Sequence, residues 1–174
     1  MPETVTGKIA RKFMAHFLDS TFGGNTPAWY RLGKDLEEYN VDLNPDTESK
    51  KNILGETTFI HNGYEPSSES EPYYARVGDA LFEKLQAIVD DRKTDDSLKT
   101  YALEVHLWDG TTTGEGQNAV TTYTAYREDC YVTPTSYGGD TSGYQIPFTV
   151  SYVGNRTKGT YNPTTGTFTA DVAA

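Results

Sequence analysis

Residues 100–107 read Thr-Tyr-Ala-Leu-Glu-Val-His-Leu, and this stretch decides the fold class. Tyr101, Leu103, Val105 and Leu107 alternate with smaller or more polar side chains, which is the two-residue period of a β-strand with two unlike faces. A second alternating run occupies residues 144–152. Pro147 within that run cannot donate a ladder hydrogen bond, so this strand is predicted to lie at a sheet edge or to carry a bulge there.

Further strands are predicted on both sides of this pair. Residues 120–133 form a long run rich in Thr and Tyr, typical of a strand that bends or crosses between sheets. Residues 157–161 and 167–169 flank Asn162-Pro163-Thr164-Thr165-Gly166 and predict a terminal hairpin. Nearer the N-terminus, short strands are expected over residues 13–18 and 28–33.

Residues 36–43 alternate cleanly, with Tyr39, Val41 and Leu43 on one side, and so predict a half-buried strand. Asn44-Pro45-Asp46 breaks this pattern, and residues 48–54 are expected to return as the partner strand of a hairpin. Residues 55–72 contain Gly, Pro, Ser and Glu but little apolar content. A polar segment of this length inside a compact domain is usually a functional loop or disordered.

One helix is predicted, at about residues 80–92. Asp79 can accept hydrogen bonds from the first free backbone N–H groups of a helix that starts at Ala80. The apolar side chains of this segment form a single helical stripe of Leu81, Phe82, Leu85, Ile88 and Val89. Arg92 and Lys93 follow at the C-terminal end, where positive charge is favoured. The pattern is typical of a helix that covers a sheet.

These elements predict a mainly β chain: an antiparallel β-sandwich or partly closed barrel with one flanking α-helix. We expect residues 1–12 to be a flexible N-terminal arm and residues 13–174 to be a single β domain with a polar loop at 55–72. No apolar stretch approaches the ~20 residues of a membrane-spanning helix, and the N-terminus lacks the apolar segment of a signal peptide.

The composition of the chain argues against some classes of function. The 174 residues carry a net charge of -10, with 25 acidic and 15 basic residues and no basic stripe. Stable binding to DNA or to an anionic membrane is therefore not expected. The chain also contains 13 Tyr, and tyrosines suit half-buried sheets and interfaces between subunits because each has a large ring with a polar tip.

The sequence predicts no catalytic, cofactor-binding or metal-binding residue, and hence no enzyme. His16, His61 and His106 are far apart and lack ligands at zinc spacing, and polarity at the surface explains His106. The acidic residues at 90–91 and 95–96 do not follow the alternating pattern of a calcium loop. The Gly-rich residues 138–143 lack the Lys of a phosphate loop and are expected to form a turn. Cys130 is expected to be a small buried side chain.

Four stretches together resemble the major tail tube proteins of long-tailed (siphovirus-type) bacteriophages. They are His16-Phe17-Leu18 with Trp29-Tyr30-Arg31-Leu32-Gly33-Lys34 and Leu43-Asn44-Pro45-Asp46-Thr47-Glu48; Gly78-Asp79-Ala80-Leu81-Phe82-Glu83; Pro134-Thr135-Ser136-Tyr137-Gly138-Gly139-Asp140; and residues 154–168. The likeness extends over residues 13–170, and no single piece is as specific as a zinc motif.

The resemblance implies a structural virion protein that forms stacked hexameric rings, whose inner sheets join into one channel from capsid to host cell. The implied partners are other copies of the chain, the tape measure protein, and the tail completion and tip proteins. Double-stranded DNA would pass through the lumen without stable binding. Synthesis and assembly would take place in the bacterial cytoplasm, and the final location would be the virion tail. No cofactor and no membrane are implied.

An acidic lumen would repel phosphates, and Glu38, Asp42 and Glu104 are the first residues to consider as its lining. The residues leave other functions open. One is a monomeric β-sandwich module that binds a carbohydrate or a protein, with Trp29, Trp108 and surface tyrosines as a stacking platform. Another is the tube subunit of a contractile tail or secretion system.

Overall fold

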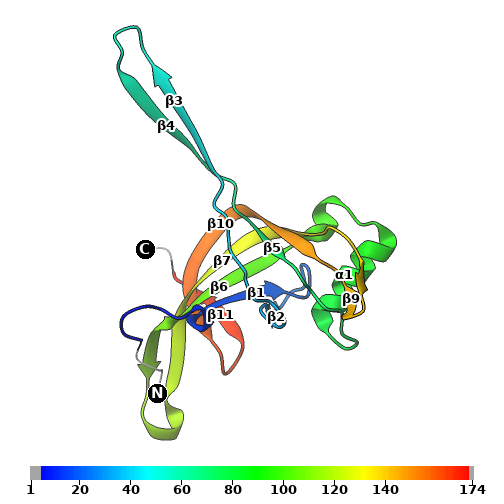
Figure 1. Ribbon diagram of the computed structural model, residues 1–174. Helices are drawn as coiled ribbons and strands as arrows, with labels where there is room; N and C mark the ends of the chain where they lie inside the picture. The colour runs from blue at the N-terminus through cyan, green and yellow to red at the C-terminus, as the bar shows by residue number, and fades with distance from the viewer. Residues whose placement is uncertain (1–4, 173–174) are drawn as a thin grey trace.

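The computed structural model describes residues 5–172 and is mainly β, as predicted. Seven strands form one antiparallel sheet in the order β11-β10-β7-β6-β1-β2, and β5 pairs with the first part of β10. Their bounds are β1 Met14–Asp19, β2 Trp29–Arg31, β5 Ser67–Ser70, β6 Lys99–Thr113, β7 Val120–Pro134, β10 Phe148–Asn162 and β11 Thr167–Ala170. The sheet curls into a half-barrel with one flanking helix (Figure 1), so the predicted fold class is confirmed.

Two small hairpins stand apart from this sheet. One joins β3, Pro45–Lys51, to β4, Thr57–Tyr64; the other joins β8, Gly138–Asp140, to β9, Gly143–Gln145. The second contains the Gly-rich residues 138–143, whose expected turn is confined to residues 141–142 between the two short strands. Three short 3-10 helices lie at Arg11–Phe13, Asp95–Leu98 and Gly116–Asn118.

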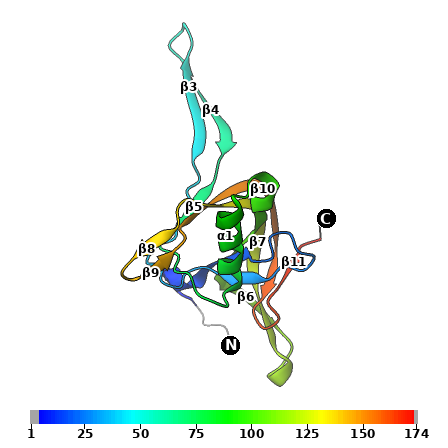
Figure 2. The same ribbon diagram turned by 90° about the vertical axis from the view of Figure 1, so that its right-hand side faces the viewer.

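The α-helix α1, Ala80–Asp91, is capped as predicted. The Asp79 carboxylate accepts hydrogen bonds from the backbone nitrogens of Leu81, at 3.0 Å, and Phe82, at 3.4 Å. The helix ends where Arg92 adopts a left-handed backbone conformation. Four residues of the apolar stripe are buried: Leu81, Leu85, Ile88 and Val89. This face of α1 lies against the sheet (Figure 2), which confirms the helix and the side that packs.

The sheet has a separate core on each face. The larger core joins Leu81 and Leu85 of the helix to Leu18, Val132 and Val150 of the strands, among others. The smaller one gathers Ala15, Phe17, Leu103, Val105, Ala125 and Tyr161 on the opposite face. The Phe17 and Tyr161 ring centroids are only 5.2 Å apart although two strands separate β1 from β10, which is possible because the sheet is strongly curled.

Two strand predictions were wrong in detail. Residues 36–43 form no strand, and their only ladder contact is the isolated bridge between Asp42 and Ser67. The alternation at residues 36–43 does not mark one buried strand face, because Tyr39 is buried in the larger core while Leu43 is exposed. Pro147 lies neither on an edge strand nor in a bulge; it falls in the gap between β9 and β10.

The prediction of a polar loop at 55–72 was also wrong. Most of that segment belongs to β4 and β5, and β4 pairs with β3, which begins at Pro45. The turn of this hairpin is therefore at residues 52–56 rather than at Asn44-Pro45-Asp46. Pro45 is tolerated as a first strand residue, where a missing N–H group costs little.

In the expected arm, residues 1–4 lie outside the described part. Residues 5–10 carry no helix or strand and Arg11 starts a 3-10 turn. The flexibility of this arm stays a prediction.

Candidate functional site

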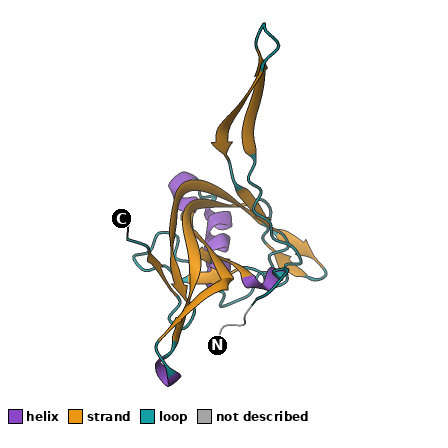
Figure 3. Ribbon diagram, turned by 90° about the vertical axis from the view of Figure 1, so that its left-hand side faces the viewer, coloured by secondary structure: helices purple, strands orange, loops and turns teal. Residues whose placement is uncertain are grey.

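The β3–β4 hairpin stands away from the body of the molecule in all three views (Figures 1, 2 and 3). Every residue of β3 is exposed, and in β4 only Ile60 and Gly63 are partly covered. An isolated two-stranded hairpin is marginally stable in water, because no third strand or packed face supports it. This element is therefore suited to burial against a second molecule.

The tip of the hairpin is a well-defined turn. The Asn52 side-chain oxygen accepts hydrogen bonds from the backbone nitrogens of Leu54, at 2.9 Å, and Glu56, at 3.0 Å. The Asn52 amide in turn donates to the Glu56 carboxylate at 2.6 Å. This turn presents Ile53, 103% exposed, and Leu54, 78% exposed, directly to solvent. Two large aliphatic side chains held outward in this way are typical of an interaction surface.

A wide groove lies at the base of the hairpin, with a volume of ≈ 860 Å³. Its rim includes Leu43, Tyr64 and Val153, all of which are more than half exposed. Its floor is charged, with Glu104, Glu128 and Arg156 among the lining residues. The hairpin and its base thus carry one cluster of exposed apolar side chains: Leu43, Ile53, Leu54, Phe59, Tyr64 and Val153.

The charged floor is a compact network. Arg156 donates hydrogen bonds to Glu104, at 3.0 Å, and to Glu128, at 3.1 Å, and its guanidinium lies 4.7 Å from the centre of the Tyr126 ring. His106 is hydrogen-bonded to Glu104 at 2.9 Å. Arg156 reaches these groups from a bulge in β10, between Gly154 and Thr157, and bulges commonly re-aim a side chain in this way.

His16 lies beside this network on β1, with its ring centroid 4.9 Å from that of Tyr39. Burial lowers the pKa of His16 from 6.5 to about 4, and the nearby Arg11 charge acts in the same direction, while Glu104 opposes it. Burial also opposes ionisation of Glu104, but the hydrogen bond with His106 and the charge of Arg156 outweigh it and lower the pKa of that carboxyl. The neutral His16 thus stands next to an ionised Glu104.

This arrangement predicts an acid-sensitive stability. Because the folded state lowers the pKa of His16 to about 4, the unfolded chain binds the proton first, and stability is lost as pH falls from 6.5 towards 4. We expect His16→Gln to remove a loss of about 3 kcal/mol between pH 7 and 4. Urea unfolding of both proteins at the two pH values measures the difference, and parallel losses in both would contradict it.

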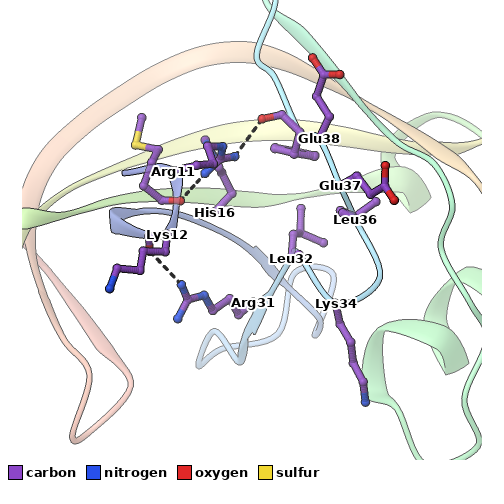
Figure 4. Close-up of a pocket in the computed structure, with 12 residues that line it drawn as sticks. Arg11, Lys12, His16, Arg31, Leu32, Lys34, Leu36, Glu37 and Glu38 are labelled. Atoms are coloured by element: carbon purple, nitrogen blue, oxygen red, sulfur yellow. Dashed lines mark hydrogen bonds between the residues drawn. The ribbon is translucent and has the colours of Figure 1, made fainter. Parts of the chain in front are cut away.

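A second, smaller pocket of ≈ 430 Å³ lies between the Arg11–Phe13 turn and residues 31–39 (Figure 4). Basic side chains predominate among its charged residues: Arg11, Lys12, Arg31 and Lys34 against Glu37 and Glu38. Arg11 is already engaged, since it donates to the backbone oxygens of Met14 and Tyr39, and Arg31 donates to the Lys12 oxygen at 3.4 Å. These bonds fix the start of β1 against the following loop, so the pocket has a structural explanation.

The residues considered from sequence fall in different places. Cys130 is fully buried, as predicted, and burial raises the pKa of its thiol. His106 is not a simple surface residue, because it stacks on Trp108 with ring centroids 4.4 Å apart and binds Glu104. Within residues 5–172, no three His, Cys, Asp or Glu side chains lie close enough to hold a metal ion. In the same range no helix is long and apolar enough to span a membrane.

The three carboxylates expected at a lumen are not equivalent. Glu104 belongs to the charged network and its side chain is only 17% exposed. Glu38 and Asp42 line a small hollow with Glu69 and Glu71 beside the loop at residues 38–42. Sequence alone did not bring Glu128 and Arg156 into consideration, although Glu128 shares a strand side with the core residues Cys130 and Val132, where a charge is unusual.

The proposed stacking platform is not assembled either. Trp29 packs against the smaller core, and Trp108 has His106 against its ring. Comparison of the chain with models of known protein families and with curated proteins found no match.

Proposed function

We propose that this chain is the major tail tube subunit of a long-tailed bacteriophage, a structural protein and not an enzyme. It forms hexameric rings that stack into a hollow conduit for double-stranded DNA. The observation that carries the proposal is the solvent-exposed β3–β4 hairpin with Ile53 and Leu54 at its tip, attached to a half-barrel. The exposed hairpin and the open half-barrel both leave strands without a neighbour, and contact with further copies of the chain would supply one.

The placement of the hairpins supports stacking in one direction. The β3–β4 hairpin projects from one end of the molecule, and the β6–β7 turn, with its 3-10 helix Gly116–Asn118, lies at the opposite end (Figure 3). Contacts between different patches at opposite ends do not close on themselves as a two-fold contact does, so they build rings or filaments.

The charge of the chain also suits a conduit. A net charge of -10 provides no general attraction for phosphates, so DNA gains little from counterion release on the subunit surface. By the same resemblance, the tape measure protein and the tail completion and tip proteins are the further partners. The subunit is made in the bacterial cytoplasm and ends in the virion tail.

The test is assembly of the purified protein. We expect a monomer in dilute solution, because high net charge keeps subunits apart, and tubes at high concentration or after nucleation. Size-exclusion chromatography and negative-stain electron microscopy measure both states. A compact monomer at every concentration and salt, with no tubes in cells that make the whole tail, would refute the proposal. That result would favour the monomeric binding module. Sheathed tubes in the cells that make the whole tail would indicate a contractile tail or secretion system.

A further inference from the structure

Residues 62 and 63 are Asn and Gly, and no other asparagine of the chain is followed by glycine. The pair lies in β4, in the half of the exposed hairpin nearer its base. In an Asn-Gly pair the backbone nitrogen of the glycine can attack the side-chain amide of the asparagine, because glycine has no Cβ to hinder the approach. Whether a folded chain permits this reaction depends on how firmly the backbone and the side chain are held.

The strand pairing leaves Asn62 without an opposite residue. Asp46 faces Gly63 and Thr47 faces His61, so Asn62 is the extra residue of a β-bulge. A bulge interrupts the hydrogen-bond ladder locally and leaves its extra residue unpaired. Towards the tip, the hairpin pairs residue by residue without a further shift. The interruption of the ladder therefore coincides with the Asn-Gly pair.

The surroundings of the pair are open as well. Asn62 is exposed, and within residues 5–172 its side-chain amide has no hydrogen-bond partner. Gly63 has a φ of 142°, and a Cβ built on it would meet no atom within 4 Å. Neither a hydrogen bond nor a packed neighbour thus holds the Asn62 side chain away from the Gly63 nitrogen.

Asn52, at the tip of the same hairpin, is held in place. Its side-chain oxygen accepts the two backbone hydrogen bonds of the turn, and its amide donates to the Glu56 carboxylate at 2.6 Å. The next residue is Ile53, whose β-branched side chain crowds the backbone nitrogen. Asn52 and Asn62 are both exposed, so the restraint on the side chain distinguishes them rather than contact with water.

We propose that Asn62 is a site of spontaneous deamidation in the folded free subunit, with water as the co-reactant. The Gly63 nitrogen loses its proton to a base in the solvent and bonds to Cγ of Asn62. The bond from Cγ to Nδ2 then breaks, and Nδ2 takes up a proton and leaves as ammonia. Water opens the resulting five-membered imide at either carbonyl carbon. Addition at Cγ gives aspartate, and addition at the backbone carbonyl gives isoaspartate.

The reaction changes the hairpin and not the body. Either product adds a negative charge beside β3, which already carries Asp46 and Glu48. Isoaspartate also lengthens the main chain of β4 by one carbon, because the backbone then runs through Cβ and Cγ. The hairpin stands away from the body (Figure 1), so the cores on the two faces of the sheet are not affected. This inference does not depend on the proposed function.

The site is tested by incubating the dilute, folded subunit at mildly alkaline pH. We expect ion-exchange chromatography to show a growing species with one additional negative charge. Trypsin releases residues 52–76 as one peptide, because no Lys or Arg lies between Lys51 and Arg76. Tandem mass spectrometry should place the exchange of NH2 for OH at Asn62 and show Asn52 intact. Asn62→Gln should abolish the acidic species, since its longer side chain would have to close a less favoured six-membered ring.

A second comparison shows whether the folded hairpin itself reacts. A marginally stable hairpin protects its residues little, so the folded subunit should react within about tenfold of the rate of the chain unfolded in guanidinium chloride. Leu85→Ala weakens the body but not the hairpin, and should leave the rate at Asn62 unchanged. Stronger protection than this, or a rate that rises in Leu85→Ala, would mean that reaction requires global unfolding. Either result, or equal conversion of Asn52, would overturn the inference.

Discussion

Tubes should fail to form when Ile53 and Leu54 are both replaced by aspartate. The two side chains protrude from a turn fixed by Asn52, with Ile53 103% and Leu54 78% exposed. In the proposed tube they would be buried in a neighbouring subunit. Burying large aliphatic side chains contributes about 1.5–3 kcal/mol each, and placing carboxylates at the same contact adds a desolvation cost. Every ring junction would repeat this loss, so we expect tube formation to be abolished.

The double substitution should leave the stability of the folded subunit unchanged. Surface substitutions away from packed features alter the free energy of unfolding by about 0.5 kcal/mol or less. Thermal melting by circular dichroism should therefore match the wild type while electron microscopy shows no tubes. Val77→Asp is the matched control, since Val77 is a 99% exposed aliphatic residue outside the hairpin. Normal tubes from the double-aspartate variant would show that the tip is not an assembly contact.

The second large effect is expected for Leu85→Ala. Leu85 is fully buried between α1 and the sheet, and removing most of its side chain opens a cavity in the larger core. The free energy of unfolding should fall by about 2–5 kcal/mol, as measured by urea denaturation. Glu83→Ala, on the exposed side of the same helix, should cost about 0.5 kcal/mol or less. Equal losses in the two variants would mean that the helix packs through a different face.

Local patterns in the sequence predicted the elements that pack against a core. The cap and apolar stripe located α1, and alternation located β6. A run rich in Thr and Tyr located β7, and the turn residues 162–166 located the terminal hairpin of β10 and β11. In α1, β6 and β7 one side of the element is buried, and the spacing of the apolar residues reflects this burial. The β3–β4 hairpin was not located correctly from the sequence because neither of its faces packs on the body of the molecule. Without a buried side, residues 45–64 have no apolar period, so the sequence predicted only part of β3, at residues 48–54, and a polar loop from residue 55.

The charged network could not be predicted for a related reason. Alternation shows which residues of one strand share a side, but not which residues of other strands lie next to them. That depends on register, and here also on the bulge in β10 that carries Arg156 towards Glu104 and Glu128. The unusual acidic residue at 128, on the core side of β7, was the available signal.

The strand order also determines when each part of the sheet can form. Strands β6, β7, β10 and β11 lie side by side in the sheet in the order in which they occur along the chain. Strand β1, in contrast, pairs with β6, so that Ala15 meets Val105 far along the chain. The entropy of closing such a long loop is lost before the stabilising contacts form, so sheets built from distant strands fold slowly. A ribosome that has released only the first hundred residues has therefore exposed β1 with β2 but without its second partner, β6. Until β6 follows, the apolar side chains of Phe17 and Leu18 remain a surface on which a chaperone can act.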